Sequence, residues 1–432
     1  MNIYEELQWR DLITGCTGSD NLDILVQGGR VADNAPGLWN QTGITLYCGF
    51  DPTADSLHVG SLVPLLALRR FQMFGYHPIA VAGGATGSIG DPSGKTQERQ
   101  LLTKDVLLKN IASVKVQLAK LLDFETKQNP ARLMDNASWT ENIPYLDFLR
   151  DIGKHFSVNQ MKAKESVRAR MEDRETGISY TEFSYMLLQA FDFYVLARDY
   201  NCTLQIGGSD QWGNITAGTD LCRKKLSKTV YGLTLPLITN ADGTKFGKTE
   251  AGAVWLDPQK TSEKDFFQFW MRTDDKDVER YLKFFTFLTE KEIVEIVKTH
   301  AQAPEHRAAQ RALAKAVTSL VHGADAAQRE VEAIDAYSGK ISGAQLLDHF
   351  PKKEFPKDKL AGEGTPLVEL MVHAGLTGSK SQARQLITGG GVEVNGERVT
   401  DFNRKISTSD IRHEKFIQLQ KGKKTHVLIV PV

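Results

Sequence analysis

The sequence predicts an α/β fold in which a Rossmann-like parallel sheet is followed by an α-helical domain and a small α+β domain. In the first part of the chain, short apolar runs alternate with helical periodicity, which is typical of a parallel sheet covered by helices. Strand-like runs disappear over residues 262–337, where Ala-rich helical periodicity dominates. The last residues combine two short helical patterns with an Asn-Gly hairpin signal.

The elements of the predicted sheet can be placed individually. Apolar runs at 44–47, 78–82 and 203–206 predict strands, and periodic segments at 57–74, 103–122 and 181–197 predict helices. Glycines follow each of the three strands, at Gly49, Gly83-Gly84 and Gly207-Gly208. Because the carboxyl ends of parallel strands share one edge of a sheet, we expect a ligand site there.

Length and composition limit the possible functions. A chain of 432 residues is too long for one hydrophobic core, and 25% charged residues with a formal net charge of +0 describe an ordinary globular protein. No apolar run approaches the ~20 residues that span a bilayer, and the start MNIYEE fits neither a signal nor a transit peptide. We therefore expect a cytoplasmic protein with no membrane partner and no DNA partner.

The cysteines and the changes in composition complete the outline. The four cysteines lack any CxxC spacing, so we expect neither a disulfide framework nor a protein-bound metal. We predict four segments, namely a Rossmann-like domain at 1–261, a helical domain at 262–350, a Pro-, Lys- and Gly-rich linker at 351–364, and a small domain at 365–432. In the last segment, 366–374 and 379–387 predict helices, 392–399 a type I′ hairpin and 425–430 a strand.

A first motif follows the strand at 44–47. After a turn rich in Gly, Asp and Pro, His58 and Gly60 fall in the first turn of the helix predicted at 57–74. Unpaired backbone N–H groups and the helix dipole favour anions there, and a His can donate to phosphate oxygens. For an isolated His-x-Gly, simple helix capping is the commoner explanation.

A second motif lies far downstream. Lys245 and Lys248 flank Phe246-Gly247 and are followed by Thr249, on a loop that begins with the turn at 240–244. Two ammonium groups and a hydroxyl can stabilise the charge that develops on a leaving pyrophosphate. A solvated surface loop would explain either lysine alone, so the phosphate interpretation depends on the first motif.

The Gly-rich stretch at 83–96 invites comparison with a P-loop. Gly90 and Gly94 are separated by three residues, whereas a Walker A motif has four, and Ile89 stands where the glycine belongs. The Walker interpretation is therefore weak.

The helix at 181–197 carries a candidate pocket. Ser179 and Glu182 form a possible capping box, and Tyr185, Gln189 and Asp192 follow at spacings that place them on one helix face. A few polar groups among apolar neighbours suit a small-molecule pocket. An amphipathic helix with a solvated polar face is the alternative.

The two motifs together resemble the HIGH and KMSKS motifs of class I aminoacyl-tRNA synthetases. The residues around the motifs, YCGFDPTADSLHVG at 47–60 and KFGKT at 245–249, are similar to those of bacterial-type tyrosyl-tRNA synthetases. This resemblance extends over nearly the whole chain. One position departs from the pattern, since Ser61 stands where the family has a second His. A Ser donates a hydrogen bond but carries no positive charge.

The resemblance implies roles for individual residues. Tyr47 and Asp192 would read a substrate phenol, Tyr185, Gln189 and Asp91 would hold its ammonium group, and Gln211 would lie near its carboxylate. The residues expected on the ATP side are Gly49, Asp51, Thr53, His58, Gly60, Gly208, Asp210, Lys245 and Lys248. The catalytic residues expected are His58, Gly60, Ser61, Thr53, Lys245, Lys248 and Thr249, with Lys95 and Arg99 on a loop near the phosphates.

The implied reaction is activation of L-tyrosine by ATP, which brings Mg²⁺ as part of the co-substrate, followed by transfer to tRNA(Tyr). Tryptophanyl-tRNA synthetases share both motifs but are disfavoured by Tyr47 and Asp192. An impaired RNA-binding or regulatory relative is the rival from another class, and Ser61 alone supports it. The family also implies a homodimer, with Tyr180 near its interface.

The C-terminal segment is the expected RNA end. Residues 365–432 contain ten Lys and Arg against six Asp and Glu, and cations near a helix start can meet phosphates. Its helix pair and hairpin resemble the RNA-binding module of the S-four type of ribosomal protein. The residues expected to contact tRNA are Arg223, Lys224, Lys225, Lys380 and Arg384.

Overall fold

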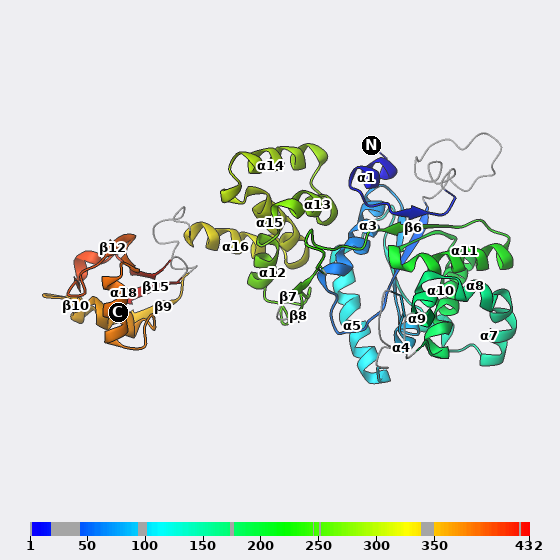
Figure 1. Cartoon of the computed structure of the whole chain (residues 1–432), viewed down its shortest axis with the longest axis horizontal. Helices are drawn as coiled ribbons and strands as arrows, with labels where there is room; N and C mark the ends of the chain where they lie inside the picture. The colour runs from blue at the N-terminus through cyan, green and yellow to red at the C-terminus, as the bar shows by residue number, and fades with distance from the viewer. Residues whose placement is uncertain are drawn as a thin grey trace. The chain divides into compact units, whose positions relative to one another are not determined.

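The computed structural model describes residues 2–18, 44–93, 102–172, 177–244, 246–249, 252–337, 350–422 and 425–432. Internal contacts divide the chain into two compact units, Met1–Gly323 and Ala324–Val432 (Figure 1). None of the helices in the described ranges has the length and apolar character that crossing a bilayer requires.

The first unit is built on a six-stranded sheet with the order β1-β6-β5-β2-β3-β4. Its strands are β1 (Gly15–Cys16), β2 (Thr45–Phe50), β3 (His77–Ala82), β4 (Arg132–Asp135), β5 (Cys202–Gly208) and β6 (Tyr231–Leu235). All pair in parallel except β1, which runs antiparallel at the edge. The three strands predicted from apolar runs are therefore confirmed, and β2 lies at the centre between β5 and β3.

Helices cover both faces of this sheet (Figure 1). They are α1 (Ile3–Trp9), α3 (Leu62–Met73), α4 (Thr86–Ile89), α5 (Lys104–Leu121), α6 (Ala137–Thr140), α7 (Tyr145–Asp151), α8 (Val158–Lys162), α9 (Glu165–Glu172), α10 (Tyr180–Asp199) and α11 (Trp212–Leu226). On one face, α10 and α11 pack in a core that includes Tyr47, Ile79 and Phe193. On the other, Leu107 and Ile111 of α5 pack against Ala82.

The helical region predicted after residue 261 is confirmed as a run of helices. They are α12 (Glu263–Met271), α13 (Asp275–Phe285), α14 (Glu290–Gln302), α15 (Ala308–His322) and α16 (Ala324–Tyr337), preceded by the ribbon β7 (Lys248–Thr249) and β8 (Gly252–Ala253). The first four share a compact unit with the sheet, whereas α16 belongs to the second unit. The unit boundary therefore does not coincide with the domain boundary predicted at 261.

The helix predicted at 57–74 starts later than expected. His58 and Gly60 precede α3, because Gly60 lies in a short 3₁₀ turn, η1 (Val59–Ser61), and His58 caps this turn in an extended conformation. Residues 57–59 instead pair with an extended segment, because Val59 N donates to Val254 O at 3.0 Å and Leu256 N to Leu57 O at 2.9 Å. Local sequence periodicity does not reveal this long-range pairing. Because of it, the helix starts at Leu62 rather than at residue 57.

The second unit contains a five-stranded sheet with the order β12-β11-β14-β15-β9. Its elements beyond α16 are β9 (Lys352–Phe355), β10 (Thr365–Pro366), α17 (Leu367–His373), α18 (Lys380–Thr388), β11 (Val392–Val394), β12 (Glu397–Val399), β13 (Lys405–Ile406), β14 (Ile417–Lys421) and β15 (Thr425–Pro431). The predicted hairpin is confirmed, since Asn395 and Gly396 both have positive φ, as a type I′ turn requires. The two predicted helices and the last strand are confirmed as well.

The linker predicted at 351–364 is wrong. Strand β9 pairs in parallel with β15, and Phe355 and Leu360 are buried in the core of the second unit. Two apolar side chains in a Pro- and Lys-rich segment are enough to anchor it, because each removes a large apolar area from water. Composition alone does not reveal that Phe355 and Leu360 are buried.

This correction can be tested with two glycines of the same segment. Gly362 and Gly364 both have positive φ, but only at Gly364 would a Cβ collide with backbone, at 2.4 Å from Ile406 O. We expect Gly362→Ala to lower the opening free energy of β15 by about 1 kcal/mol and Gly364→Ala by about 3 kcal/mol. Hydrogen exchange of the β15 amides in the full chain measures both free-energy changes. If both were negligible, the prediction of a linker at 351–364 would be supported instead.

Candidate active site

The candidate site lies at the carboxyl edge of the parallel sheet. Four polar side chains follow four of its strands, with Asp51 after β2, Thr86 after β3, Asn136 after β4 and Gln211 after β5. Strand order changes direction around β2, since its two neighbours β3 and β5 come from different crossovers. This is the place where open α/β sheets bind ligands.

Asp192 of α10 is the central carboxylate. It is 4% exposed and accepts hydrogen bonds from Asn136 Nδ2 at 2.9 Å and Trp139 Nε1 at 2.8 Å. Burial raises the pKa of Asp192 to about 7, although these two hydrogen bonds oppose the rise. A buried carboxyl that changes charge near neutral pH is typical of a binding or catalytic position.

A hydrogen-bond chain links Asp192 to Asp51. Asn136 Nδ2 also donates to Thr86 Oγ1 at 2.9 Å, and Thr86 Oγ1 donates to Asp51 Oδ1 at 2.8 Å. Tyr185 Oη donates to the other oxygen, Asp51 Oδ2, at 2.8 Å. The backbone makes room for this chain at Gly83, where a Cβ would lie 2.1 Å from Asp51 Oδ1.

Two buried polar atoms beside this chain have no hydrogen-bond partner among the described residues. They are Tyr47 Oη and Gln189 Oε1. Burial, and next the charge of Asp192, raises the pKa of Tyr47 well above its usual value, so its hydroxyl stays neutral. An unpaired buried polar atom costs about 1–3 kcal/mol. Tyr47 Oη and Gln189 Oε1 are therefore suited to a polar ligand.

A second polar cluster surrounds Asp91, which is 8% exposed. Gln211 Nε2 donates to Asp91 Oδ2 at 2.6 Å, and Ser93 N donates to Asp91 Oδ1 at 2.9 Å. Asn214 Nδ2 lies 3.2 Å from Gln211 Oε1. Burial, and then the charges of Asp51 and Asp91, raises the pKa of Tyr185, so two carboxylates act on this part of the site and favour a cationic ligand group.

The first motif is held by local contacts. His58 is exposed, and its Nδ1 accepts a hydrogen bond from Gly60 N at 3.0 Å. A Cβ at Gly60 would lie 2.7 Å from the His58 ring, so glycine is required for this ring position. Capping by His58 is thus part of the geometry, and the residue is exposed. Ser61 makes no side-chain capping bond to α3.

The second motif reaches the first through backbone pairing. Residues 57–59 pair with 254–256, and Val254 N also donates to Gly247 O at 2.9 Å. Gly247 has φ +76°, and a Cβ there would lie 2.7 Å from Val59 Cγ2. The described parts of the two motifs, separated by almost 200 residues, are therefore in direct contact.

The other predicted site residues have different outcomes. Gly49, Thr53, Gly208 and Asp210 lie at the same sheet edge, and a Cβ at Gly49 would meet nothing within 4 Å. Lys248 is exposed, and Thr249 follows it in β7. Lys95, Arg99 and Lys245 lie outside the described residues. Across the described ranges, no group of three or more His, Cys, Asp or Glu could hold a metal ion.

The basic residues predicted for RNA make contacts within the protein. Lys224 Nζ donates to His155 O at 2.7 Å, Lys225 Nζ donates to Asp151 O at 3.0 Å, and Arg223 pairs with Asp220. In the second unit, Lys380 pairs with Glu369, and the exposed Arg384 lies over the Phe402 ring at 5.7 Å. The side chains of Arg223 and Arg384 are both exposed.

Sequence reasoning missed four residues of the site. They are Thr86, Asn136, Trp139 and Asn214. Asn136 and Trp139 follow the short strand β4, whose run RLMD is only weakly apolar. Identifying β4 as a parallel strand would have pointed to its carboxyl end.

The chain has clear relatives among known proteins. The family described as tRNA synthetases class I (W and Y) matches residues 40–337, and the tyrosine–tRNA ligase SYY-like C-terminal domain matches residues 345–429. A tyrosine–tRNA ligase of Opitutus terrae is 53% identical over 436 residues, covering 99% of both chains. That of Bacillus caldotenax is 50% identical over 434 residues, with the same coverage.

A solved structure shares the architecture. A C-terminally truncated mitochondrial tyrosyl-tRNA synthetase of Aspergillus nidulans has a TM-score of 0.67 and 33% identity, covering 77% of this chain and 92% of its own. With the two motifs in contact beside a buried polar pocket, these matches show that the chain belongs to the class I tRNA synthetases of the tryptophan and tyrosine group.

Proposed function

We propose that this chain is a tyrosine–tRNA ligase. It activates L-tyrosine with ATP, releases pyrophosphate, and transfers the tyrosyl group to the 3′-terminal ribose of tRNA(Tyr). The observation that carries this proposal is the buried pair formed by Asp192, a carboxylate, and Tyr47, whose hydroxyl has no partner among the described residues. The full-length relatives with about half of their residues identical are tyrosine–tRNA ligases.

The pocket chemistry favours tyrosine over its neighbours in the group. A phenol can donate to Asp192 and meet Tyr47 Oη, whereas phenylalanine leaves Tyr47 Oη without a partner and adds no hydrogen bond to those that Asp192 accepts from Asn136 and Trp139. A site built to bind a substrate hydroxyl discriminates strongly, and the rejection of phenylalanine by tyrosyl-tRNA synthetases is the established example of this effect. The ammonium group of the substrate suits the surroundings of Asp91, Gln189 and Tyr185, and Gln211 would contact its carboxylate.

Activation requires positioning more than acid–base chemistry. The substrate carboxylate is already a nucleophile and attacks the α-phosphorus of ATP, so the enzyme mainly aligns the reactants and stabilises charge. The exposed His58 and Lys248 approach the phosphates from two contacting motifs. Lys245, Thr249, Lys95 and Arg99 belong to the same proposal, and Mg²⁺ enters with ATP.

The proposal extends to assembly and location. Tyr145, Leu146 and Tyr180 expose 63%, 75% and 64% of their surfaces. A hydrogen bond between Tyr180 and Tyr145 raises the pKa of Tyr180, so these two side chains, with Leu146 beside Tyr145, form one patch. An exposed apolar patch of this kind suits an interface between two copies. We therefore propose a cytoplasmic homodimer that uses this patch.

The decisive measurement is ATP–pyrophosphate exchange with tyrosine, phenylalanine and tryptophan in parallel. We expect exchange with tyrosine only. A Ser61→His variant, tested alongside, shows whether the second motif His strengthens ATP binding. Exchange restored only by the variant would mean that Ser61 has silenced a synthetase, and no exchange in either protein, with RNA binding intact, would favour the RNA-binding relative.

Tyrosine binding should depend on pH through Asp192. Its pKa of about 7 in the free protein means that the carboxylate, the better acceptor for a phenol, is lost below pH 7. Tyrosine affinity should therefore rise about tenfold per pH unit as the pH approaches 7 and then level off. Calorimetric titration from pH 5.5 to 8.5 measures this, and an equal slope in Asp192→Asn would refute the assignment.

The RNA end makes a separate prediction. Arg384 is exposed on α18, and its loss should remove about one phosphate contact. We expect Arg384→Ala to weaken tRNA binding by about 1 kcal/mol and to reduce the salt slope of the affinity by about one. Filter binding at several salt concentrations tests this, with pyrophosphate exchange, which needs no tRNA, as the control for folding. Unchanged affinity and slope would place the contact elsewhere.

A further inference from the structure

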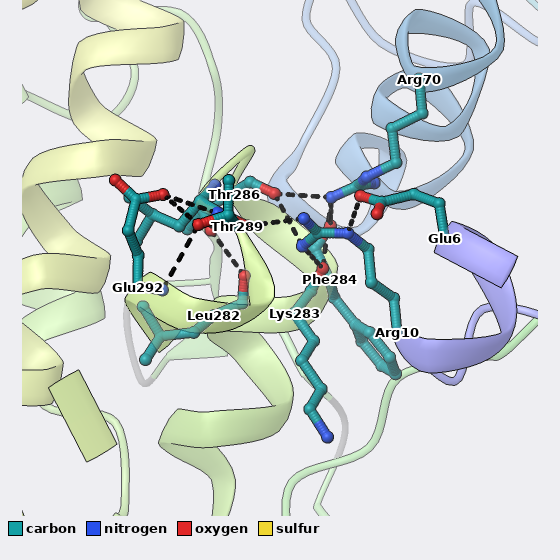
Figure 2. A network of polar contacts seen from close by, with 10 residues as sticks. Glu6, Arg10, Arg70, Leu282, Lys283, Phe284, Thr286, Thr289 and Glu292 are labelled. Atoms are coloured by element: carbon teal, nitrogen blue, oxygen red, sulfur yellow. Dashed lines mark hydrogen bonds and ion pairs between the residues drawn. The ribbon is translucent and has the colours of Figure 1, made fainter. Parts of the chain in front are cut away.

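Two buried arginines donate hydrogen bonds to backbone carbonyl groups at the C-terminal end of α13 (Figure 2). Arg10 follows α1, Arg70 lies near the end of α3, and each is 1% exposed. Arg10 donates to the carbonyl oxygens of Lys283 at 2.8 Å, Thr286 at 3.2 Å and Leu288 at 2.6 Å. Arg70 donates to those of Lys283 at 3.2 Å, Phe284 at 3.0 Å and Thr286 at 2.7 Å.

These contacts satisfy a helix end that has no internal partners. The last carbonyl groups of a helix lack intrahelical donors and carry partial negative charge, which cations stabilise. Burial, and next the charge of Arg10, lowers the pKa of Arg70 to about 9, so its guanidinium remains charged at neutral pH. The C-terminal end of α13 is therefore fixed to α3 by short, buried, directional bonds.

Side chains along α13, before its C-terminal end, hold the base of the second-motif loop. Asp277 Oδ2 accepts from Ala241 N at 2.9 Å, and Tyr281 Oη donates to Asn240 Oδ1 at 2.8 Å. Arg280 Nη2 donates to Thr239 O at 2.6 Å. A cavity of about 450 Å³ opens beside these contacts, so a few hydrogen bonds, rather than close packing, locate the loop base.

The loop is also anchored within the second motif itself. The Phe246 ring stacks on Phe285 of α13, with ring centroids 5.2 Å apart, and meets Tyr281 edge-on at 5.1 Å. The rings of Trp270 and Phe269 of α12 also pack against Phe246. The next residue, Gly247, is the one that contacts Val59 of the first motif.

These contacts link the two motifs in a closed loop that runs through α3 and α13. Helix α3 begins directly after the first motif, and Arg70 in its last turn bonds to the end of α13. Helix α13 holds Phe246, and Gly247 returns to the first motif at Val59. Arg70 is the ninth residue of α3, so this part of the path is ~12 Å long along the helix axis. The placement of the second motif therefore depends on groups remote from the substrate pocket.

We propose that Arg10 and Arg70 are positioning residues for tyrosine activation, acting through α13 on the second motif. The proposal rests on the proposed function, because adenylate formation is its readout. Loss of the hydrogen bonds from Arg10 and Arg70 lets α13 shift. The lysines of the second motif then contact the leaving pyrophosphate in a smaller fraction of molecules. The tyrosine pocket, built on α10 and the sheet edge, is untouched.

The test compares Arg70→Met with Arg69→Met in the full chain. Arg69 is the adjacent residue on α3, half-buried, and bonds to Gln72 instead of α13. The readout is the single-turnover rate of tyrosyl-adenylate formation per titrated active site, together with the dissociation constant for tyrosine. We expect Arg70→Met to lower the rate at least tenfold with tyrosine affinity within twofold, and Arg69→Met to match the parent.

Two further measurements keep the inference decidable if Arg70→Met folds poorly. Tyr281→Phe deletes only the hydrogen bond to Asn240 and keeps the ring, and we expect its rate to fall about threefold without loss of active sites. Limited trypsin digestion should cut after Lys248 faster in Arg70→Met and Tyr281→Phe than in Arg69→Met. Where both variants fold, their double variant should be no slower than Arg70→Met, because both act through one helix.

The outcomes separate the two proposals. A parent without pyrophosphate exchange refutes the proposed function. An active parent whose rate per active site is unchanged by both Arg70→Met and Tyr281→Phe refutes only the positioning role. Fewer active sites with an unchanged rate would show that the arginines merely stabilise the fold.

Discussion

The backbone pairing between residues 57–59 and 254–256 is the constraint on which the candidate site depends. It shortens helix α3, leaves His58 extended just before a 3₁₀ turn rather than inside a helix, and brings Gly247 against Val59. A pair of strand-like hydrogen bonds has a defined register, so the two motifs cannot slide past each other without breaking them. The described parts of the two motifs are therefore held in contact although they are remote in sequence.

A second constraint is the cost of burying polar groups. Asp192, Asn136, Thr86, Asp51 and Tyr185 form one hydrogen-bonded chain beneath the sheet edge. Inside a low-dielectric site, a satisfied network of this kind is rigid, whereas an unpaired member is costly. Tyr47 Oη and Gln189 Oε1, beside this chain, are buried without a hydrogen-bond partner among the described residues. A ligand with a hydroxyl and a charged end would therefore fit the binding role that we propose for this pocket.

The accuracy of the sequence predictions followed the range of the interactions involved. The three strands, the α10 face carrying Tyr185, Gln189 and Asp192, and the Asn395-Gly396 turn depend on local periodicity and local φ preferences, and the structure has all of them. The linker prediction failed because β9 is held by β15, which composition does not reveal. Asn136 and Trp139 were missed since a short, weakly apolar strand gave no clear local signal.

The sequence by itself determined the family, the two motifs, the parallel α/β class and the residue types of the pocket. These are encoded in short stretches whose spacing and chemistry can be read directly. Only the tertiary structure decided that Asn136 and Trp139 bind Asp192, that Gly247 meets Val59, and that two buried arginines hold the end of α13. The physical reason is that each of these contacts joins segments far apart in the chain, and their pairing depends on the packing of the whole sheet and its helices.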